Sequence, residues 1–274
     1  MKNLFINKNR LISQLTNCLI IFLLLSFTDN TYTYKTSIKN KFDYFTTDPQ
    51  GAVYLIKKDV LEKYNSDGKL IKTYSNKNLG NISSVDASNP LRVILFYKDF
   101  QQIVFLDNTL SQNGSPLLLQ NIGVEQASLA CSSNNNGLWI FDSNNFELKR
   151  FDGNLQKTAS TGNIARMQNI SLSVNYIIEN NNMIFLNDLE TGILTFDIFG
   201  TYRNTIPLKG LSSFQVNEDF ITYFSDKKLK VYNRKAMEET NYPTPDSTAL
   251  NTRIEKNLIY IQKENSLNIF TSGK

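Results

Sequence analysis

The sequence predicts an all-β fold: a six-bladed β-propeller with four-stranded antiparallel blades, the last blade being closed by an N-terminal strand. Three observations lead to this prediction. A pair of adjoining strand patterns recurs six times, the recurrences have the spacing of propeller blades, and a spare strand pattern precedes the first unit. The strand patterns are rich in Tyr, Phe, Ile, Val and Thr, and no long helical periodicity follows the first 28 residues.

The N-terminal segment has the features of an export signal. Basic residues come first (Lys2, Lys8 and Arg10), and an apolar run follows from Leu19 to Leu25. This run is far shorter than the roughly 20 apolar residues that cross a bilayer. We therefore expect a signal peptide over 1–28 and a periplasmic protein. An uncleaved membrane anchor is the alternative, because the segment contains no Ala-x-Ala cleavage site.

Composition excludes several function classes. The chain has 29 Lys and Arg, 25 Asp and Glu and no His. Removing the signal removes three basic residues and leaves a net charge of +1, which is too small to attract nucleic acid or an anionic membrane. The absence of His excludes Ser-His-Asp catalysis and His-ligated metals. Cys131 is the only Cys after residue 28, and we expect it to be a small buried hydrophobe.

The segment after the signal consists of one unit repeated six times. In each unit an apolar strand follows a polar turn, and a second strand comes after a short polar break. The residues that follow this second strand are Asn65, Asp107, Asp152, Asp197, Asn233 and Thr271. Their spacings are 42, 45, 45, 36 and 38 residues, close to the roughly 40–50 residue period of propeller blades. An up-and-down barrel also has many short strands, but it lacks such a long period.

One domain over 29–274 accommodates all six units. The blades are expected at approximately 42–79, 82–120, 126–162, 170–209, 212–246 and 248–271. The strands of the first blade are predicted at Phe42–Thr47, Ala52–Lys57, Val60–Asn65 and Lys69–Tyr74. The sixth unit provides three strands, and the spare pattern at 31–38 supplies the missing outer one. Pairing of this segment with Leu267–Thr271 would close the ring and cover the edge of the last blade.

No motif in the chain points to a catalytic or metal site. The pairs Asp67-Gly68 and Asp152-Gly153 lack the further oxygen ligands of a calcium loop, and they are typical of hairpin turns. The equivalent residues Asp107, Asp152 and Asp197 are expected to cap turns. The stretch from Ser133 to Trp139 faintly resembles the Asp-box turn of sialidases, but it occurs once and its acidic position is Asn135. We therefore predict no catalytic residues, no cofactor and no metal, and a protein that is not an enzyme.

The segment Asn81–Asn108 resembles a signature of exported propeller-like proteins of Bacteroidota-type bacteria. The similarity extends to the periplasmic plug of the type IX secretion translocon, which closes a large outer-membrane channel. This resemblance implies that the partner is a protein component of an outer-membrane translocon. Within the segment, Asn89-Pro90 is predicted to form a turn that Asp86 caps. The functional hypothesis is that this turn and Tyr97-Lys98-Asp99-Phe100 form a partner-facing rim. The candidate partner-binding residues are Asp86, Asn89, Pro90, Tyr97, Lys98, Asp99 and Phe100.

Two functions follow from the sequence. The first is a non-catalytic periplasmic interaction module that binds or plugs an outer-membrane secretion channel, binds no nucleic acid and is monomeric by itself. The alternative is a propeller that binds, or also hydrolyses, a carbohydrate or another small ligand, with Trp139 and rim tyrosines stacking on sugar rings. Trp139 lies within a predicted second strand, where burial is the expected outcome, and this weakens the alternative.

Overall fold

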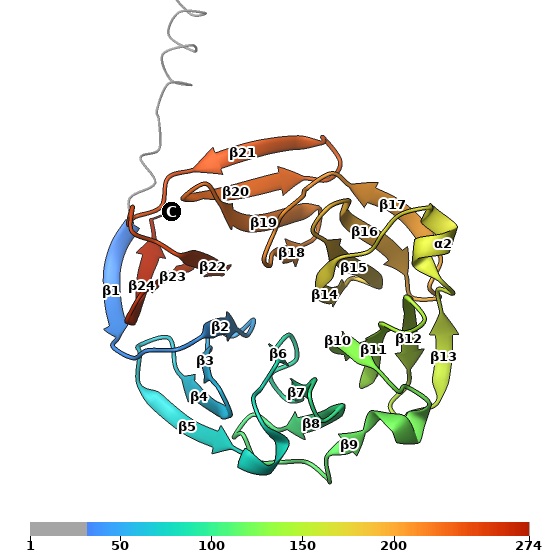
Figure 1. The fold of residues 1–274 in the computed structure, drawn as a ribbon. Helices are drawn as coiled ribbons and strands as arrows, with labels where there is room; N and C mark the ends of the chain where they lie inside the picture. The colour runs from blue at the N-terminus through green and yellow to red at the C-terminus, as the bar shows by residue number, and fades with distance from the viewer. Residues whose placement is uncertain (1–31, 274) are drawn as a thin grey trace, which may run out of the picture.

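A computed structural model describes residues 32–273 and shows six four-stranded antiparallel sheets arranged in a ring (Figure 1). The predicted six-bladed propeller is confirmed. The predicted signal peptide lies outside the described residues. The innermost strands face the centre of the ring: β2 (Tyr44–Thr47), β6 (Ser84–Asp86), β10 (Ala127–Ser133), β14 (Val174–Asn180), β18 (Gln215–Asn217) and β22 (Asn251–Glu255).

The other strands follow outward in each blade, and we letter the four strands A to D from the centre. The B strands are β3 (Val53–Lys57), β7 (Val93–Tyr97), β11 (Gly137–Asp142), β15 (Met183–Asp188), β19 (Phe220–Ser225) and β23 (Leu258–Lys263). The C strands are β4 (Val60–Tyr64), β8 (Gln102–Leu106), β12 (Glu147–Phe151), β16 (Gly192–Asp197), β20 (Lys228–Asn233) and β24 (Ser266–Ser272). The D strands are β5 (Leu70–Ser75), β9 (Leu117–Leu118), β13 (Lys157–Ser160), β17 (Tyr202–Ile206), β21 (Glu238–Tyr242) and β1 (Tyr32–Ile38).

The described helices are short and connect blades. They are the 3-10 helices η1 (Lys77–Leu79) and η2 (Leu119–Ile122) and the α-helix α2 (Ile164–Gln168). Within residues 32–273, no helix has the length and apolar content needed to cross a bilayer.

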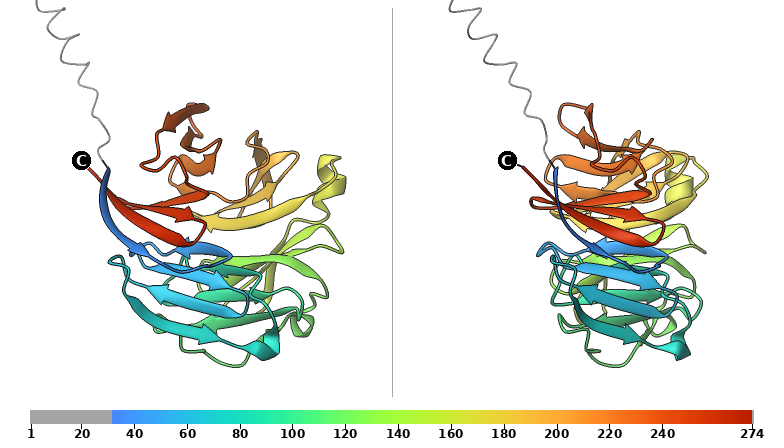
Figure 2. Two further views of the ribbon diagram at one scale, coloured as in Figure 1. Left: turned by 60° about the vertical axis from the view of Figure 1, so that its left-hand side comes forward. Right: turned by 90° about the vertical axis from the view of Figure 1, so that its left-hand side faces the viewer.

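The strand β1 closes the ring as predicted. It pairs antiparallel with β24, from Tyr32 opposite Ser272 to Ile38 opposite Leu267. Figure 2 shows the two strands side by side, although they come from opposite ends of the described chain. The Ser37 hydroxyl donates a 2.8 Å hydrogen bond to Asn268 Oδ1, and Ile38 is buried. The last blade therefore contains both the first and the last strands of the fold.

The hydrophobic core lies between neighbouring blades. One cluster joins the first two blades through Tyr54, Leu61 and Val93, and another joins the third and fourth through Trp139 and Ile184. Most B strands are apolar without alternation because a blade covers each of their faces, whereas burial alternates along β19. All five residues of β7 are buried, for example. Such a continuous short apolar run is typical of a strand buried on both sides.

The connections between strands define two faces of the disc. Because the strands alternate in direction, the A–B and C–D connections lie on one face, which we call the A–B face. The B–C connections and the links from each D strand to the next blade lie on the opposite face, which we call the B–C face. The predicted turn caps are present on the A–B face. Asp152 Oδ1, for instance, accepts hydrogen bonds of 2.9 Å from the backbone N–H groups of Asn154 and Gln156.

The same cap recurs in other blades. Asp107 Oδ1 accepts from the N–H groups of Thr109 and Ser111. Asp197 Oδ1 accepts from those of Phe199 and Thr201. Each carboxylate thus satisfies two backbone donors of its own turn, which is the role that their common position in the repeat predicted.

Candidate functional site

The seven residues predicted to bind a partner do not share one surface. Asp86 and the Asn89-Pro90 turn lie at the A–B end of β7, where Asp86 is opposite Ile94. Lys98, Asp99 and Phe100 form the turn at its other end, on the B–C face. A strand of five residues spans about 17 Å, so the prediction of one continuous rim is wrong. The error arose because the two turns are close in sequence but separated by the height of the disc.

Tyr97 is not available to a partner in this structure. Its side chain is fully buried in the core between the first two blades. The sequence did not predict this burial, because the apolar residues of β7 are continuous and show no alternation between a buried and an exposed side. Phe100, in contrast, is 50% exposed on the B–C face. Asp86 caps the start of the predicted turn by accepting a 2.8 Å hydrogen bond from the N–H of Ser88. The Asn89 side chain, which was not predicted to be a cap, also accepts a 3.0 Å hydrogen bond from the N–H of Leu91.

The B–C face carries exposed apolar side chains on three consecutive blades. Phe100 belongs to the second blade, Phe146 to the third, and Leu189 to the fourth. Met167, 58% exposed, belongs to α2 between the third and fourth blades. The Ile164 N–H donates a 2.9 Å hydrogen bond to the Phe146 carbonyl and holds α2 beside that turn. We call Phe100, Phe146, Met167 and Leu189 the apolar B–C residues.

Three of these four residues were missed in the sequence. Phe146 directly follows the polar run Ser143-Asn144-Asn145, and Leu189 begins the B–C turn of the next unit. An apolar residue inside a turn that is polar in other repeats is a signal that an alignment of the units could have revealed.

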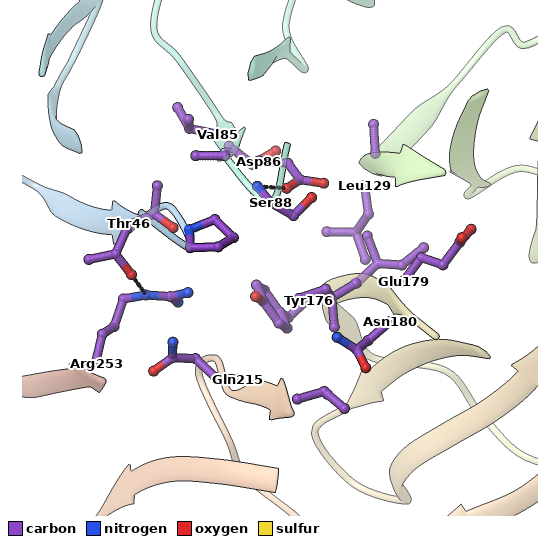
Figure 3. Close-up of a pocket in the computed structure, with 18 of the residues that line it drawn as sticks. Thr46, Val85, Asp86, Ser88, Leu129, Tyr176, Glu179, Asn180, Gln215 and Arg253 are labelled. Carbon is purple, nitrogen blue, oxygen red and sulfur yellow. Dashed lines mark hydrogen bonds between the residues drawn. The ribbon is translucent and has the colours of Figure 1, made fainter. Parts of the chain in front are cut away.

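A cavity of about 220 Å³ occupies the centre of the ring (Figure 3). Residues from the innermost strands of all six blades line it. Its lining includes Pro49 and Ser88 from A–B connections, so the cavity reaches toward the A–B face. Charged and polar lining groups include Asp86, Tyr176, Glu179, Arg253 and Glu255.

One wall of the cavity links the first, fifth and sixth blades. Arg253 Nε donates a 2.9 Å hydrogen bond to Thr47 Oγ1, and that hydroxyl donates one of 2.5 Å to Glu255 Oε1. Gln215 Nε2 also donates to Glu255 Oε1, at 3.0 Å. Burial raises the pKa of Glu255, while the hydrogen bond from Thr47 and the charge of Arg253 oppose that rise. This wall is held together by side chains from three blades.

The opposite wall links the second, third and fourth blades. Asp86 Oδ2 accepts a 2.6 Å hydrogen bond from the Ser132 N–H. Glu179 Oε2 accepts bonds of 2.6 Å from the Ser133 hydroxyl and 2.7 Å from the Trp139 indole. These carboxylates therefore act as hydrogen-bond anchors between blades.

Trp139 and Cys131 are both buried, as the sequence suggested. Trp139 is fully buried with its indole committed to Glu179, so it cannot stack on a sugar in this structure. Burial raises the pKa of the Cys131 thiol, which disfavours the reactive thiolate. Within residues 32–273, no group of three or more Cys, Asp or Glu side chains is arranged to hold a metal ion.

Comparisons with known proteins support the fold. No protein-family model matches the chain. No curated protein matches it by sequence. Among solved structures, it is similar to the WD40 domain of Neurospora crassa Pan2, with a TM-score of 0.58 and 8% identity over 89% of this chain and 96% of that one.

Two further similar structures differ in their described roles. One is a gluconolactonase from Xanthomonas campestris, with a TM-score of 0.61 and 11% identity over 86% of this chain and 89% of that one. The other is a chain of the mitotic checkpoint complex, with a TM-score of 0.57 and 9% identity over 90% of this chain and 94% of that one. Since identities are this low, these similarities establish a β-propeller and leave function to be argued from the sites.

Proposed function

We propose that this chain is an exported, non-catalytic β-propeller that binds a protein partner through its B–C face. The observation that carries the proposal is the set of apolar B–C residues, exposed on three consecutive blades. Aromatic side chains and Met are enriched in protein interfaces, where they supply much of the buried apolar area. The engagement of Asp86, Glu179 and Glu255 in bonds between blades supports a binding role over a catalytic one.

We further propose an outer-membrane component of a type IX-like secretion channel as the partner, and the periplasm as the location. The N-terminal sequence pattern and the resemblance of Asn81–Asn108 to exported propellers support this choice. Phe100 belongs to the resembling segment and lies on the B–C face. In similar solved structures, propellers occur within protein assemblies, as in the mitotic checkpoint complex.

Affinity capture from detergent-solubilised envelopes of the native bacterium tests the proposal. The tagged full chain is expected to recover an outer-membrane β-barrel protein. The triple variant Phe100→Ser, Phe146→Ser and Met167→Ser should lose at least nine-tenths of that recovery, because it removes the apolar contacts. The matched control is the double variant Phe199→Ser and Met237→Ser, which changes side chains 71% and 75% exposed in C–D connections on the A–B face.

The control variant should recover the partner as the unchanged chain does. Equal recovery by the B–C variant, or recovery of no outer-membrane protein by the unchanged chain, contradicts the proposal. Circular dichroism of each variant checks that the fold is retained, since all these side chains are exposed.

A further inference from the structure

Exposed lysines gather on one sector of the B–C face. They lie in the link from β1 to β2, in the B–C turns of the first and second blades, and in the link between these blades: Lys39, Lys41, Lys57, Lys58, Lys77 and Lys98. The same four segments contain only three acids, Asp43, Asp59 and Asp99. We call these six lysines the basic sector. Its charge is positive, although the charges of the chain after the predicted signal nearly balance.

Hydrogen bonds join the four segments into one surface. The Lys58 N–H donates a 2.8 Å bond to Asp43 Oδ2, and the Lys58 carbonyl accepts one of 2.9 Å from the Ile82 N–H. The Lys98 N–H donates a 3.0 Å bond to the Ser83 hydroxyl, in the same link as Ile82. The backbone therefore holds these lysines on one continuous patch that runs from the first blade to the second.

The acids of these segments do not neutralise the lysines. Among residues 32–273, no carboxylate lies within ion-pair distance of a lysine of the basic sector. Asp59 accepts a 2.7 Å hydrogen bond from the Ser75 hydroxyl instead. This bond does most to lower the pKa of Asp59, and the charges of Lys77 and Lys58 lower it further. The ammonium groups are thus available to an anion on a partner.

The basic sector borders an apolar side chain of the proposed partner surface. Phe100 lies two positions after Lys98 and is half-exposed. A Cβ atom placed on Gly80 would come within 3.1 Å of the Phe100 ring, so the ring lies against the link that contains Lys77. Protein interfaces commonly combine an apolar centre with a polar rim. Phe100 therefore connects the basic sector with the apolar B–C residues.

The opposite face of the first two blades has the reverse balance of charge. Its turns and the adjoining strand ends contain four acids and two bases: Asp48, Asp67, Asp86, Asp107, Lys69 and Arg92. The two faces are about 17 Å apart, which exceeds the screening length of about 8 Å at physiological ionic strength. Each face therefore acts through its own charge, and the B–C face attracts and orients an anionic partner.

We propose that the basic sector binds an acidic segment of the partner protein, whose Asp and Glu side chains face the lysines while its apolar residues contact Phe100. This inference rests on the proposed function and names the chemistry of its partner. Lysine ammonium groups are point charges on flexible stems, which suits carboxylates spread along a segment. The three acids among the lysines disfavour a continuous anionic membrane, whereas a protein segment can place its carboxylates away from them.

Fluorescence anisotropy of a labelled acidic peptide with the full chain tests this inference. The probe is the peptide Glu-Glu-Phe-Glu-Glu-Leu-Glu-Glu, and the matched probe has Gln in place of every Glu. At low ionic strength the acidic peptide should bind saturably and at least tenfold more tightly than the Gln peptide, and added salt should reduce this difference. The absence of saturable binding, or equal affinity for the two peptides, overturns the proposal.

Two charge-reversal variants locate the binding. The test variant changes three lysines of the basic sector and should weaken binding of the acidic peptide at least tenfold: Lys58→Glu, Lys77→Glu and Lys98→Glu. The control variant changes three exposed lysines in or beside turns of the A–B face and should bind the peptide almost as the unchanged chain does: Lys69→Glu, Lys157→Glu and Lys256→Glu. Both variants alter the net charge equally, so equal weakening would indicate attraction to net charge and would overturn the proposal. Circular dichroism checks that both variants fold.

Two further measurements distinguish the partner from a membrane and this inference from the proposed function. Cosedimentation with phosphatidylglycerol vesicles that requires the three test lysines, without binding of the acidic peptide, would assign the basic sector to a membrane and overturn the proposal. In the envelope capture, the test variant should lose most of the recovered partner, and equal recovery also overturns the proposal. If the unchanged chain recovers no outer-membrane protein but binds the acidic peptide through these lysines, the proposed function fails and the acidic preference of the basic sector stands.

Discussion

Glu179 shows how a single polar side chain on an innermost strand can join two blades. Its carboxylate accepts hydrogen bonds from Ser133, from the Asn134 N–H and from the Trp139 indole, all in the neighbouring blade. Ser133 also accepts a 2.9 Å bond from Arg150 Nε, which extends the network to β12. A buried donor that loses its acceptor keeps the whole cost of desolvation. Glu179 therefore stabilises the fold chiefly by accepting hydrogen bonds from donors that would otherwise be buried and unpaired.

Replacing Glu179 by Ala is expected to destabilise the fold by about 2–3 kcal/mol, because the indole and the Ser133 hydroxyl lose their acceptor. Urea unfolding at neutral pH measures the free energy of unfolding. The control is Glu190→Ala, at an exposed position in the B–C turn of the same blade, and it should change stability by less than about 0.5 kcal/mol. Equal stability of the two variants would contradict the anchoring role.

The local part of this chemistry was predictable from sequence, and the long-range part was not. The caps at Asp107, Asp152 and Asp197 bond to N–H groups two and four residues later, so the turn pattern alone predicts them. Glu179 and Trp139 are separated by 40 positions, and Asp86 and Ser132 by 46. Such partners are set by the packing of whole blades, which no local pattern contains.

In the third blade, a buried ion pair joins two adjacent strands. Lys149 Nζ on β12 lies 2.6 Å from Asp142 Oδ2 on β11, and the two side chains are 10% and 3% exposed. Burial acts to raise the pKa of Asp142. The hydrogen bonds from Lys149 and Asn145 outweigh it, so the pKa is lowered overall. Removing one member of such a pair is costly, whereas removing both charges is often nearly neutral.

We therefore expect Lys149→Met to destabilise the chain by about 3–5 kcal/mol at pH 7, since Asp142 remains charged and buried. A lowered carboxylate pKa stabilises the fold above the unfolded value of about 3.9, and this stabilisation is lost as the pH falls through the folded pKa. The difference between the variant and the unchanged chain should therefore narrow below about pH 4. Chemical denaturation of both proteins from pH 7 to pH 3 measures this difference in the free energy of unfolding.

The double variant Asp142→Asn and Lys149→Met is the control for this pair. It removes both charges and keeps an acceptor for the backbone of the turn, so it should recover most of the lost stability. A double variant less stable than Lys149→Met would contradict the ion-pair explanation.

Strand bounds and strand faces differ in how far the sequence could predict them. The third strand of the first blade was expected at Val60–Asn65 and is Val60–Tyr64. The sequence predicts this bound closely because the turn residues that end the strand are its neighbours in the chain. The exposure of individual B-strand residues was not predictable. Every side chain of β7 is covered by one of the two neighbouring blades, and the strand has no polar side to indicate which blade each side chain faces.

At the scale of the whole molecule, stability depends on closing the ring. Ser37 and Asn268, which hydrogen bond across β1 and β24, are 231 positions apart. Contacts between such distant residues form only after a large loss of chain entropy, so we expect slow folding. Tyr34 packs edge-on against Phe270 with centroids 5.6 Å apart, and Ile38 is 4% exposed. These contacts and the strand pairing offset the entropy of closure.

Removing β1 should therefore cost far more than removing an unpaired tail. A chain beginning at Phe42 loses the burial of Ile38, worth about 1.5–3 kcal/mol, and several strand hydrogen bonds of about 0.5–1.5 kcal/mol each. For a chain of this size, each kcal/mol shifts the Tm by about 2–4 °C, so the expected decrease is roughly 10 °C or more, with aggregation through the exposed edge of β24. A chain beginning at Asn30 retains β1 and is the matched control. Differential scanning calorimetry at one protein concentration compares the two, and equal Tm values would refute closure by β1.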